Sequence, residues 1–185
     1  DSYKTLCQCF KDEYFDGNNV ISSLEPERLI CLINNDKIPF TDGNISILKG
    51  TEVYSNYLIH NKADFLENIS KVEINKPDVA KDILESDELS YSEKETVIKK
   101  IPESMMFCSP ELSNSIINVI LNTGLNMNEG TLKELIKTST KEELRVRLAN
   151  KMIKDLNYNE DEIIDILSLL GEQYESIYLS DDNVS

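Results

Sequence analysis

The chain has 185 residues, of which 34 are acidic and 19 basic, and its formal net charge at pH 7 is −15. Such an excess of negative charge disfavours direct binding to nucleic-acid phosphates and to anionic membranes, because both require a basic surface. With no tryptophan, six glycines and five prolines, the composition favours helices over turn-rich β-sandwiches and barrels. No apolar run is long enough for a transmembrane helix.

The first sixty residues predict several short helices. Leu6, Phe10 and Tyr14 recur every four residues, so a first helix is expected to end near 16–17. Further helices are expected over 23–35, 45–50 and 51–60.

The middle of the chain predicts three more helices. A helix over 61–71 is expected to bury Phe65 and Ile69, and another follows the linker at 72–76. Ser90 and Glu93 have the spacing of a capping box, in which each residue's side chain satisfies the other's backbone N–H. The helix that they begin is expected to stop at Pro102, because the residue before a proline disfavours helical geometry.

The C-terminal part predicts four longer helices. Ser109 and Pro110 form a clear start signal, and Gly124 a stop signal. Thr140 and Glu143 predict a second capping box. The four helices are expected over about 109–123, 128–138, 141–154 and 159–170, and 180–185 is expected to be a frayed tail.

One pattern recurs at the predicted joints between helices. Two apolar residues at alternate positions precede a short polar residue, and a further apolar residue follows it by four positions. The copies begin at residues 38, 72, 125 and 156, with outer spacings of 34 and 31 residues. Short polar side chains cap helix N-termini, and the candidates are Thr41, Asn75, Asn128 and Asn159.

These joints predict an all-α fold. Spacings in the thirties are typical of two-helix repeats, so we expect a right-handed α-α superhelix, a solenoid-like stack of helical hairpins; an irregular helical bundle is the alternative. We expect one domain over 1–185, with a possible sub-boundary near 102–109. Because the chain does not begin with methionine, we expect it to be a piece of a longer protein.

No residue pattern predicts catalysis, a cofactor or a metal site. His60 is the only histidine, and no nucleophile motif surrounds any serine or cysteine. Asp161 and Asp165 share a helix face, but acids in a first turn favour the helix dipole. Phosphate-binding glycine loops are absent. The cysteine spacing fits no zinc site, which favours free thiols and a cytoplasmic location.

Two groups of side chains are candidates for surface contacts. Tyr54, Tyr57, Tyr174 and Tyr178 sit at helical spacing and could form an interaction surface, although the edges of a core are the more common place for such rings. Arg145 and Arg147 belong to the only basic cluster, which we interpret as a solvated helix face because acids interrupt it.

The segments 35–45 and 87–94 resemble the helical repeats that follow the ATPase domain of large bacterial YobI-like P-loop NTPases. The resemblance extends over most of the chain from Leu24 onward. It implies a non-catalytic repeat region of an NTPase-linked protein. It transfers no functional residue, because the nucleotide-binding motifs of that family have no counterpart here.

We therefore expect a helical-repeat interaction or regulatory module that binds a protein partner or another part of its own full-length chain. Two other hypotheses stay open. One is a small carboxylate-dependent hydrolase in a helical bundle, and the other is an acidic decoy for nucleic-acid-binding proteins.

Overall fold

The computed structural model describes residues 58–59 and 61–171. Residues 61–171 form eight helices and no strand, so the prediction of an all-α fold is confirmed for this part of the chain. The helices predicted before residue 58, the Thr41 cap and the tail at 180–185 lie outside the described residues. The chain divides into two compact units, unit 1 (Asp1–Pro102) and unit 2 (Glu103–Ser185), with the division at the start of the 102–109 segment. That the whole chain is one domain stays a prediction.

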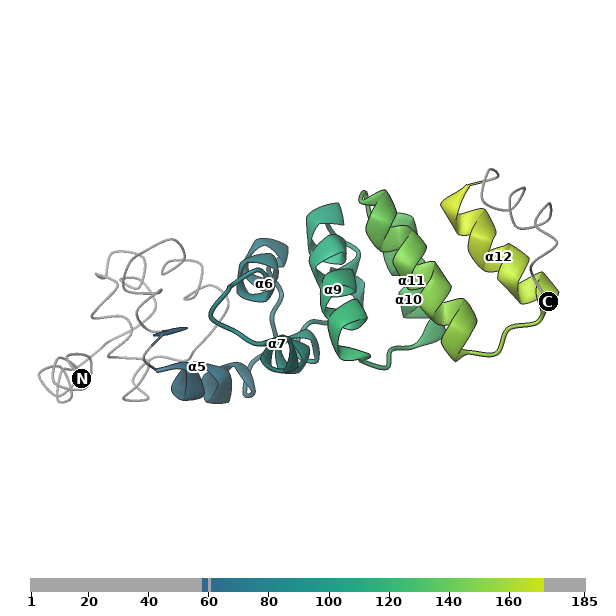
Figure 1. Ribbon diagram of the computed structural model, residues 1–185. Coiled ribbons are helices and arrows are strands. Elements are labelled where there is room, and N and C mark those ends of the chain that lie inside the picture. The colour runs from purple at the N-terminus through teal and green to yellow at the C-terminus, as the bar shows by residue number, and fades with distance from the viewer. Residues whose placement is uncertain (1–57, 60, 172–185) are drawn as a thin grey trace, which may run out of the picture. The chain divides into compact units, whose positions relative to one another are not determined.

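The described part of unit 1 is built from three short helices, seen in blue and dark teal in Figure 1. They are α5 (Lys62–Ile69), α6 (Pro77–Leu84) and α7 (Tyr91–Ile98). Helix α7 packs against both α5 and α6. Their apolar faces enclose a small core, whose fully buried members include Phe65, Ile69, Ile74, Ile83 and Ile98.

The start of α7 is the capping box that the sequence predicts. The Ser90 hydroxyl accepts the Glu93 N–H at 3.2 Å, and the Glu93 carboxylate accepts the Ser90 N–H at 2.9 Å. Glu93 also pairs with Lys62 of α5 at 3.1 Å. Burial acts to raise the pKa of Glu93, but the hydrogen bonds from Ser90 and the contact with Lys62 outweigh it and lower that pKa.

The start of α6 differs from the prediction. Asn75 is not the cap: the N-cap position is occupied by Lys76, and no side chain closes it. Pro77 explains this difference, because a proline at the first helical position fixes its own φ and holds the preceding residue in an extended conformation. The linker before α6 is held to the segment after α7 by Ile74, whose N–H donates to the Lys100 carbonyl at 2.8 Å.

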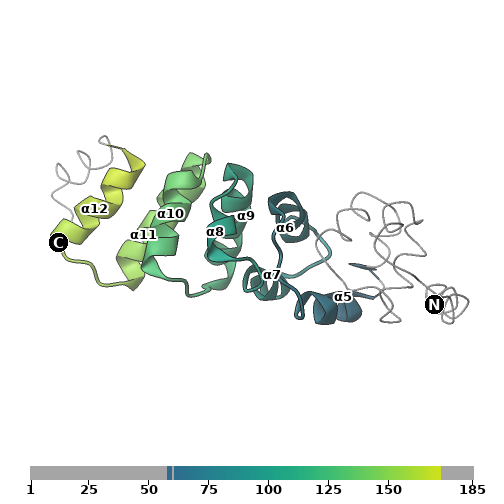
Figure 2. The same cartoon turned by 180° about the vertical axis from the view of Figure 1, so that it is seen from behind.

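Unit 2 contains α8 (Glu103–Met106), α9 (Pro110–Thr123), α10 (Glu129–Thr138), α11 (Glu142–Asp155) and α12 (Glu160–Leu170). Helix α9 packs against α10 and α11, while α10 packs against α11 and α12. In Figure 1 α11 lies in front of α10, and Figure 2 shows the order reversed from behind. Two hairpins, α9–α10 and α11–α12, are thus stacked in two layers. A regular right-handed superhelix stays a prediction.

Helix α9 lies at the centre of this unit. Every residue from Leu112 to Ile117 is buried, so the helix is enclosed on all sides at this level. Its apolar side chains meet Leu135 and Ile136 of α10 and Leu148 of α11 in the core, and all of these are fully buried. The buried polar residues of α9 are hydrogen-bonded, as Ser113 is to the Met106 carbonyl at 2.8 Å.

Three predicted caps in unit 2 are confirmed. The Ser109 hydroxyl accepts the Leu112 N–H at 3.1 Å, and Asn159 accepts the Glu162 N–H at 2.9 Å. Asn128 accepts the Gly130 N–H at 2.8 Å.

The predicted capping box at Thr140 is wrong. Helix α11 begins at Glu142, with Lys141 at the N-cap and no side-chain cap bond. Thr140 instead binds Asn114 of α9: its hydroxyl accepts from the Asn114 amide at 3.1 Å, and its N–H donates to Asn114 Oδ1 at 3.2 Å. Thr140 therefore hydrogen-bonds to the buried Asn114 of α9 and does not cap α11, although its spacing to Glu143 predicts a cap.

Candidate binding groove

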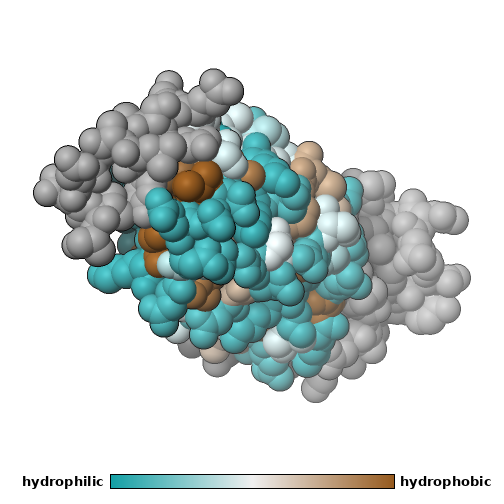
Figure 3. Space-filling view, turned by 90° about the vertical axis from the view of Figure 1, so that its right-hand side faces the viewer, coloured by the Kyte–Doolittle hydropathy of each residue, from teal (hydrophilic) through white to brown (hydrophobic). Residues whose placement is uncertain are grey.

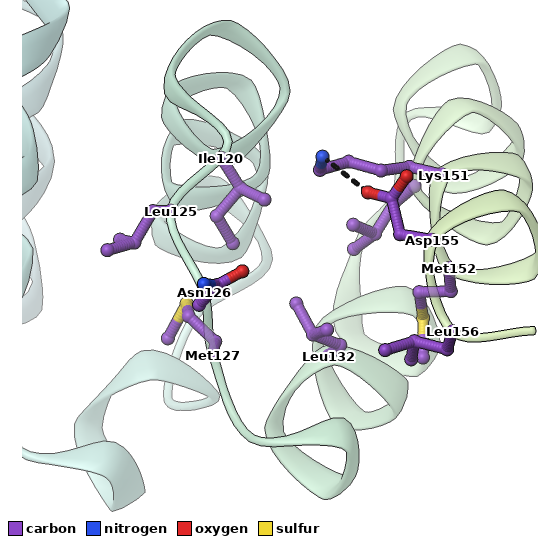
Figure 4. A pocket seen from close by; sticks show the side chains of 10 residues that line it. Ile120, Leu125, Asn126, Met127, Leu132, Lys151, Met152, Asp155 and Leu156 are labelled. Atoms are coloured by element: carbon purple, nitrogen blue, oxygen red, sulfur yellow. Dashed lines mark hydrogen bonds and ion pairs between the residues drawn. The ribbon is translucent and has the colours of Figure 1, made fainter.

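Unit 2 has an apolar groove between the α9–α10 linker and the C-terminal end of α11. Its cavity volume is about 60 Å³. In Figure 4, Ile120 and Met127 lie on one side, Met152 and Leu156 on the other, and Leu132 lies between them. We call this cavity and its rim the joint groove, because residues of two successive joints line it.

Local sequence explains how the groove is built. Gly124 adopts the left-handed conformation, with φ of 71°, and ends α9 there. The linker then runs past Met127 to the Asn128 cap, which starts α10 and places Leu132 one turn into the helix. The opposite wall comes from Met152 and Leu156, at the end of α11 and the start of the following joint.

Leu156 stands at this groove with 45% of its surface exposed. Val72, at the same position of the earlier joint, is half-buried. An extended linker would point alternate apolar side chains to one side. Asn157 has φ of 51°, so the chain turns directly after Leu156 and the alternation is lost.

An exposed leucine is uncommon on this surface. The only other exposed large hydrophobic residues in the described part of the chain are Ile59 and Tyr91, at 50% and 40%. On the face seen in Figure 3, hydrophobic residues are scattered among many hydrophilic ones.

Polar residues surround the groove, and several are already paired. Lys151 and Asp155 form an ion pair at 2.8 Å on the rim, drawn as a dashed line in Figure 4. The Tyr158 hydroxyl donates to Glu129 at 2.8 Å and so joins the two successive linkers. Glu129 also pairs with Lys133 at 3.1 Å.

The contact between Tyr158 and Glu129 changes the pKa of both groups. The hydrogen bond from Tyr158, followed by that from Lys133, lowers the pKa of Glu129. Burial first, and then the bond to Glu129, raises the pKa of Tyr158. The negative charge of Glu162 also raises the pKa of Tyr158.

Beyond the groove, the first turn of α12 carries three exposed acids, Glu160, Asp161 and Glu162. Within the described residues none of them forms an ion pair, and neither does the exposed Lys154. Three carboxylates without an ion-pair partner among the described residues therefore follow the groove along the chain, in a first turn where they also face the positive end of the helix dipole.

Arg145 is not the solvated cation that the sequence predicts. Only 20% of its side chain is exposed. Its guanidinium donates to the Ile136 carbonyl at 2.9 Å and to the Leu169 carbonyl at 2.6 Å. It therefore joins α11 to the C-terminal turns of α10 and α12. Arg147 is 51% exposed and matches the prediction.

The candidate residues named from sequence do not form this groove. His60, Tyr54, Tyr57, Tyr174 and Tyr178 lie outside the described residues, and their role stays a prediction. Asp161 and Asp165 are both exposed, and no group of three or more potential metal ligands occurs in the described part of the chain. Among the described helices, none has the length and apolar character needed to cross a membrane.

The groove itself was missed from sequence, although the joint pattern contains most of its wall. The signal that could have found it is the repeated apolar pair before each cap. Comparison with protein-family models, with curated proteins and with solved structures finds no match for this chain. The resemblance to YobI-like NTPases stays a prediction.

Proposed function

We propose that this chain is a non-catalytic interaction module that binds a protein segment in the joint groove. The segment belongs to a partner protein or to another part of the full-length chain. The observation that carries the proposal is the exposed Leu156 beside an apolar cavity walled by Leu132 and Met152. Grooves or pockets that receive the apolar side chains of an extended or helical segment are a recurring mode of protein recognition.

The size of the groove supports a protein side chain as its occupant. Pockets for small molecules and cofactors usually measure about 300–1,000 Å³, whereas this cavity measures about 60 Å³. Such a volume accommodates one apolar side chain inserted as an anchor. Methionine walls also suit peptide binding, because their thioethers adapt to the shape of the ligand.

The proposed setting of the module is the cytoplasm, as part of a larger NTPase-linked bacterial protein. Cys108 supports a reducing compartment, since it is an exposed free thiol. The association with an NTPase rests on the sequence resemblance alone.

A photo-cross-linking amino acid at position 156 tests the binding site. We expect it to form a saturable adduct with one protein species in the cell that makes this chain, or with another segment of the full-length chain. The matched control carries the same amino acid at Ile59, which is 50% exposed against 45% for Leu156 but belongs to unit 1. Equal adducts at both positions, or none at position 156, would contradict the proposal.

A further inference from the structure

We infer that the joint groove recognises a short peptide segment with one apolar anchor residue and, within about four residues on one side of it, lysine or arginine. The inference rests on the proposed function and adds the chemistry of the partner. Two features of the structure carry it: the cavity beside Leu156 and the acids at the start of α12, which form no ion pair among the described residues.

The anchor is defined by the shape and polarity of the cavity. Ile120, Leu132 and Met152 present apolar side chains, and Leu156 extends the apolar surface outward. A leucine, isoleucine or methionine of a partner would bury its side chain here and also cover Leu156. A charged side chain would lose hydration without gaining a free partner, because Lys151 and Asp155 already neutralise each other.

The basic residues are defined by the charges that the groove leaves unpaired. Glu129 is neutralised by Lys133 and also accepts from Tyr158. No ion pair is formed by Glu160, Asp161 or Glu162 among the described residues. Between residues 151 and 171, Lys154 is the only cation without an ion pair to a described residue. A basic segment would therefore be attracted and an acidic one repelled.

The spacing follows from the reach of the chain. Glu160 is four residues beyond Leu156, so their Cα atoms lie no more than about 14 Å apart. An extended peptide covers this distance in about four residues, which sets the separation between its anchor and its basic residues.

The test is a selection of random twelve-residue peptides against the full chain, followed by fluorescence anisotropy on the enriched peptides. We expect the enriched sequences to carry a leucine, isoleucine or methionine with lysine or arginine within about four residues on one side. Raising the salt concentration from about 50 to about 500 mM should weaken their binding several-fold, because exposed charges are screened.

Two variants separate the anchor from the charges. Leu156→Ser should raise the dissociation constant about tenfold, whereas Ile59→Ser should leave it unchanged. The triple change Glu160→Gln, Asp161→Asn and Glu162→Gln should raise it by a similar factor and remove most of the salt dependence. Glu143→Gln is its control, since this acid occupies the first turn of α11, the far end of a helix about 21 Å long.

The outcomes distinguish this inference from the proposed function. If no peptide binds saturably, or if binding is insensitive to Leu156→Ser, the groove is not a peptide site and both are overturned. If peptides bind at Leu156 but are neutral or acidic and indifferent to the triple change, only the basic recognition rule is overturned. Salt titration of the unmodified protein tests the basic recognition rule, although not the position of the anchor, without depending on the folding of any variant.

Discussion

At the scale of single residues, Arg145 connects three helices of unit 2, although its sequence context indicates a solvated side chain. A cation in an alternating run of charges is usually solvated, and long-range partners cannot be read from spacing. Here the two carbonyls that accept from Arg145 lie nine and 24 residues away. Both lie near helix C-termini, where carbonyls lack partners and positive charge is favoured.

We predict that Arg145→Ala lowers the free energy of unfolding by about 2 kcal/mol, because it removes charged hydrogen bonds to two half-buried carbonyls. The matched change Arg147→Ala should cost less than about 0.5 kcal/mol, since Arg147 forms an exposed pair with Glu143 at 3.9 Å. Urea denaturation followed by circular dichroism measures both. Equal losses for the two variants would show that Arg145 does not act through its carbonyl contacts.

Thr140 marks the limit of prediction at this scale. Its spacing to Glu143 matches a capping box as well as that of Ser90 to Glu93, yet only Ser90 caps a helix. The difference is Asn114, whose amide accepts from Ser139 at 2.5 Å and also binds Thr140. Because Asn114 is buried, its hydrogen bonds must be satisfied, and this requirement overrides the local pattern.

At the scale of elements, the sequence predicts helices well and their exposed joints poorly. The caps at Ser90, Ser109, Asn128 and Asn159 depend only on neighbouring residues, so spacing was sufficient to find them. The exposure of Leu156 follows from the backbone conformation of Asn157, which the apolar pattern does not specify. The joint groove was missed for the same reason.

The contact between the two joints predicts a pH dependence. The pKa of Glu129 is lowered in the folded chain, chiefly by the hydrogen bond from Tyr158. This contact therefore stabilises the fold at pH values above the pKa of an unfolded glutamate, which is about 4.3. The stabilisation is lost as the pH falls through the lower pKa that Glu129 has in the folded chain. For Tyr158 the folded pKa is raised, so its contribution is present below about 10 and is lost as the pH rises further.

We predict that Tyr158→Phe lowers the melting temperature at neutral pH and that the difference from the unmodified chain shrinks as the pH falls below about 4. Thermal melts between pH 2 and 8 measure it. Tyr91→Phe is the control, because Tyr91 is also exposed in part but lies in unit 1. A difference that stays constant across this pH range would show that the hydroxyl does not act through Glu129.

At the scale of the whole molecule, composition and the repeated joints predict an all-α class, which is confirmed for the described residues. The sequence also predicts stacked hairpins, but which helices pack side by side, α9 with α11 and α10 with α12, depends on contacts between residues that are distant in sequence. The six-residue buried stretch from Leu112 to Ile117 includes polar residues, which hid its central position from a reading of amphipathic faces. A regular superhelix, a single domain and the link to an NTPase stay predictions.

The division between Pro102 and Glu103 predicts that each unit responds to its own core substitutions. Ile116→Ala should cost about 2–4 kcal/mol, because Ile116 is fully buried in α9. Hydrogen exchange followed by mass spectrometry should then speed up in α9 to α12 and not in α5 to α7. Phe65→Ala, in the core of unit 1, should give the reverse pattern. Faster exchange in both units from either variant would show that they unfold together.

The two methionines on opposite walls of the joint groove have one more consequence. An unbranched thioether changes shape at little cost, so the cavity can remould itself around leucine, isoleucine or methionine. Partners would then be free to diverge at the anchor position without losing contact, as long as their positive charges are kept. Peroxide that converted the half-buried Met127 to its sulfoxide would make one wall polar and weaken the attachment, and methionine sulfoxide reductases would restore it.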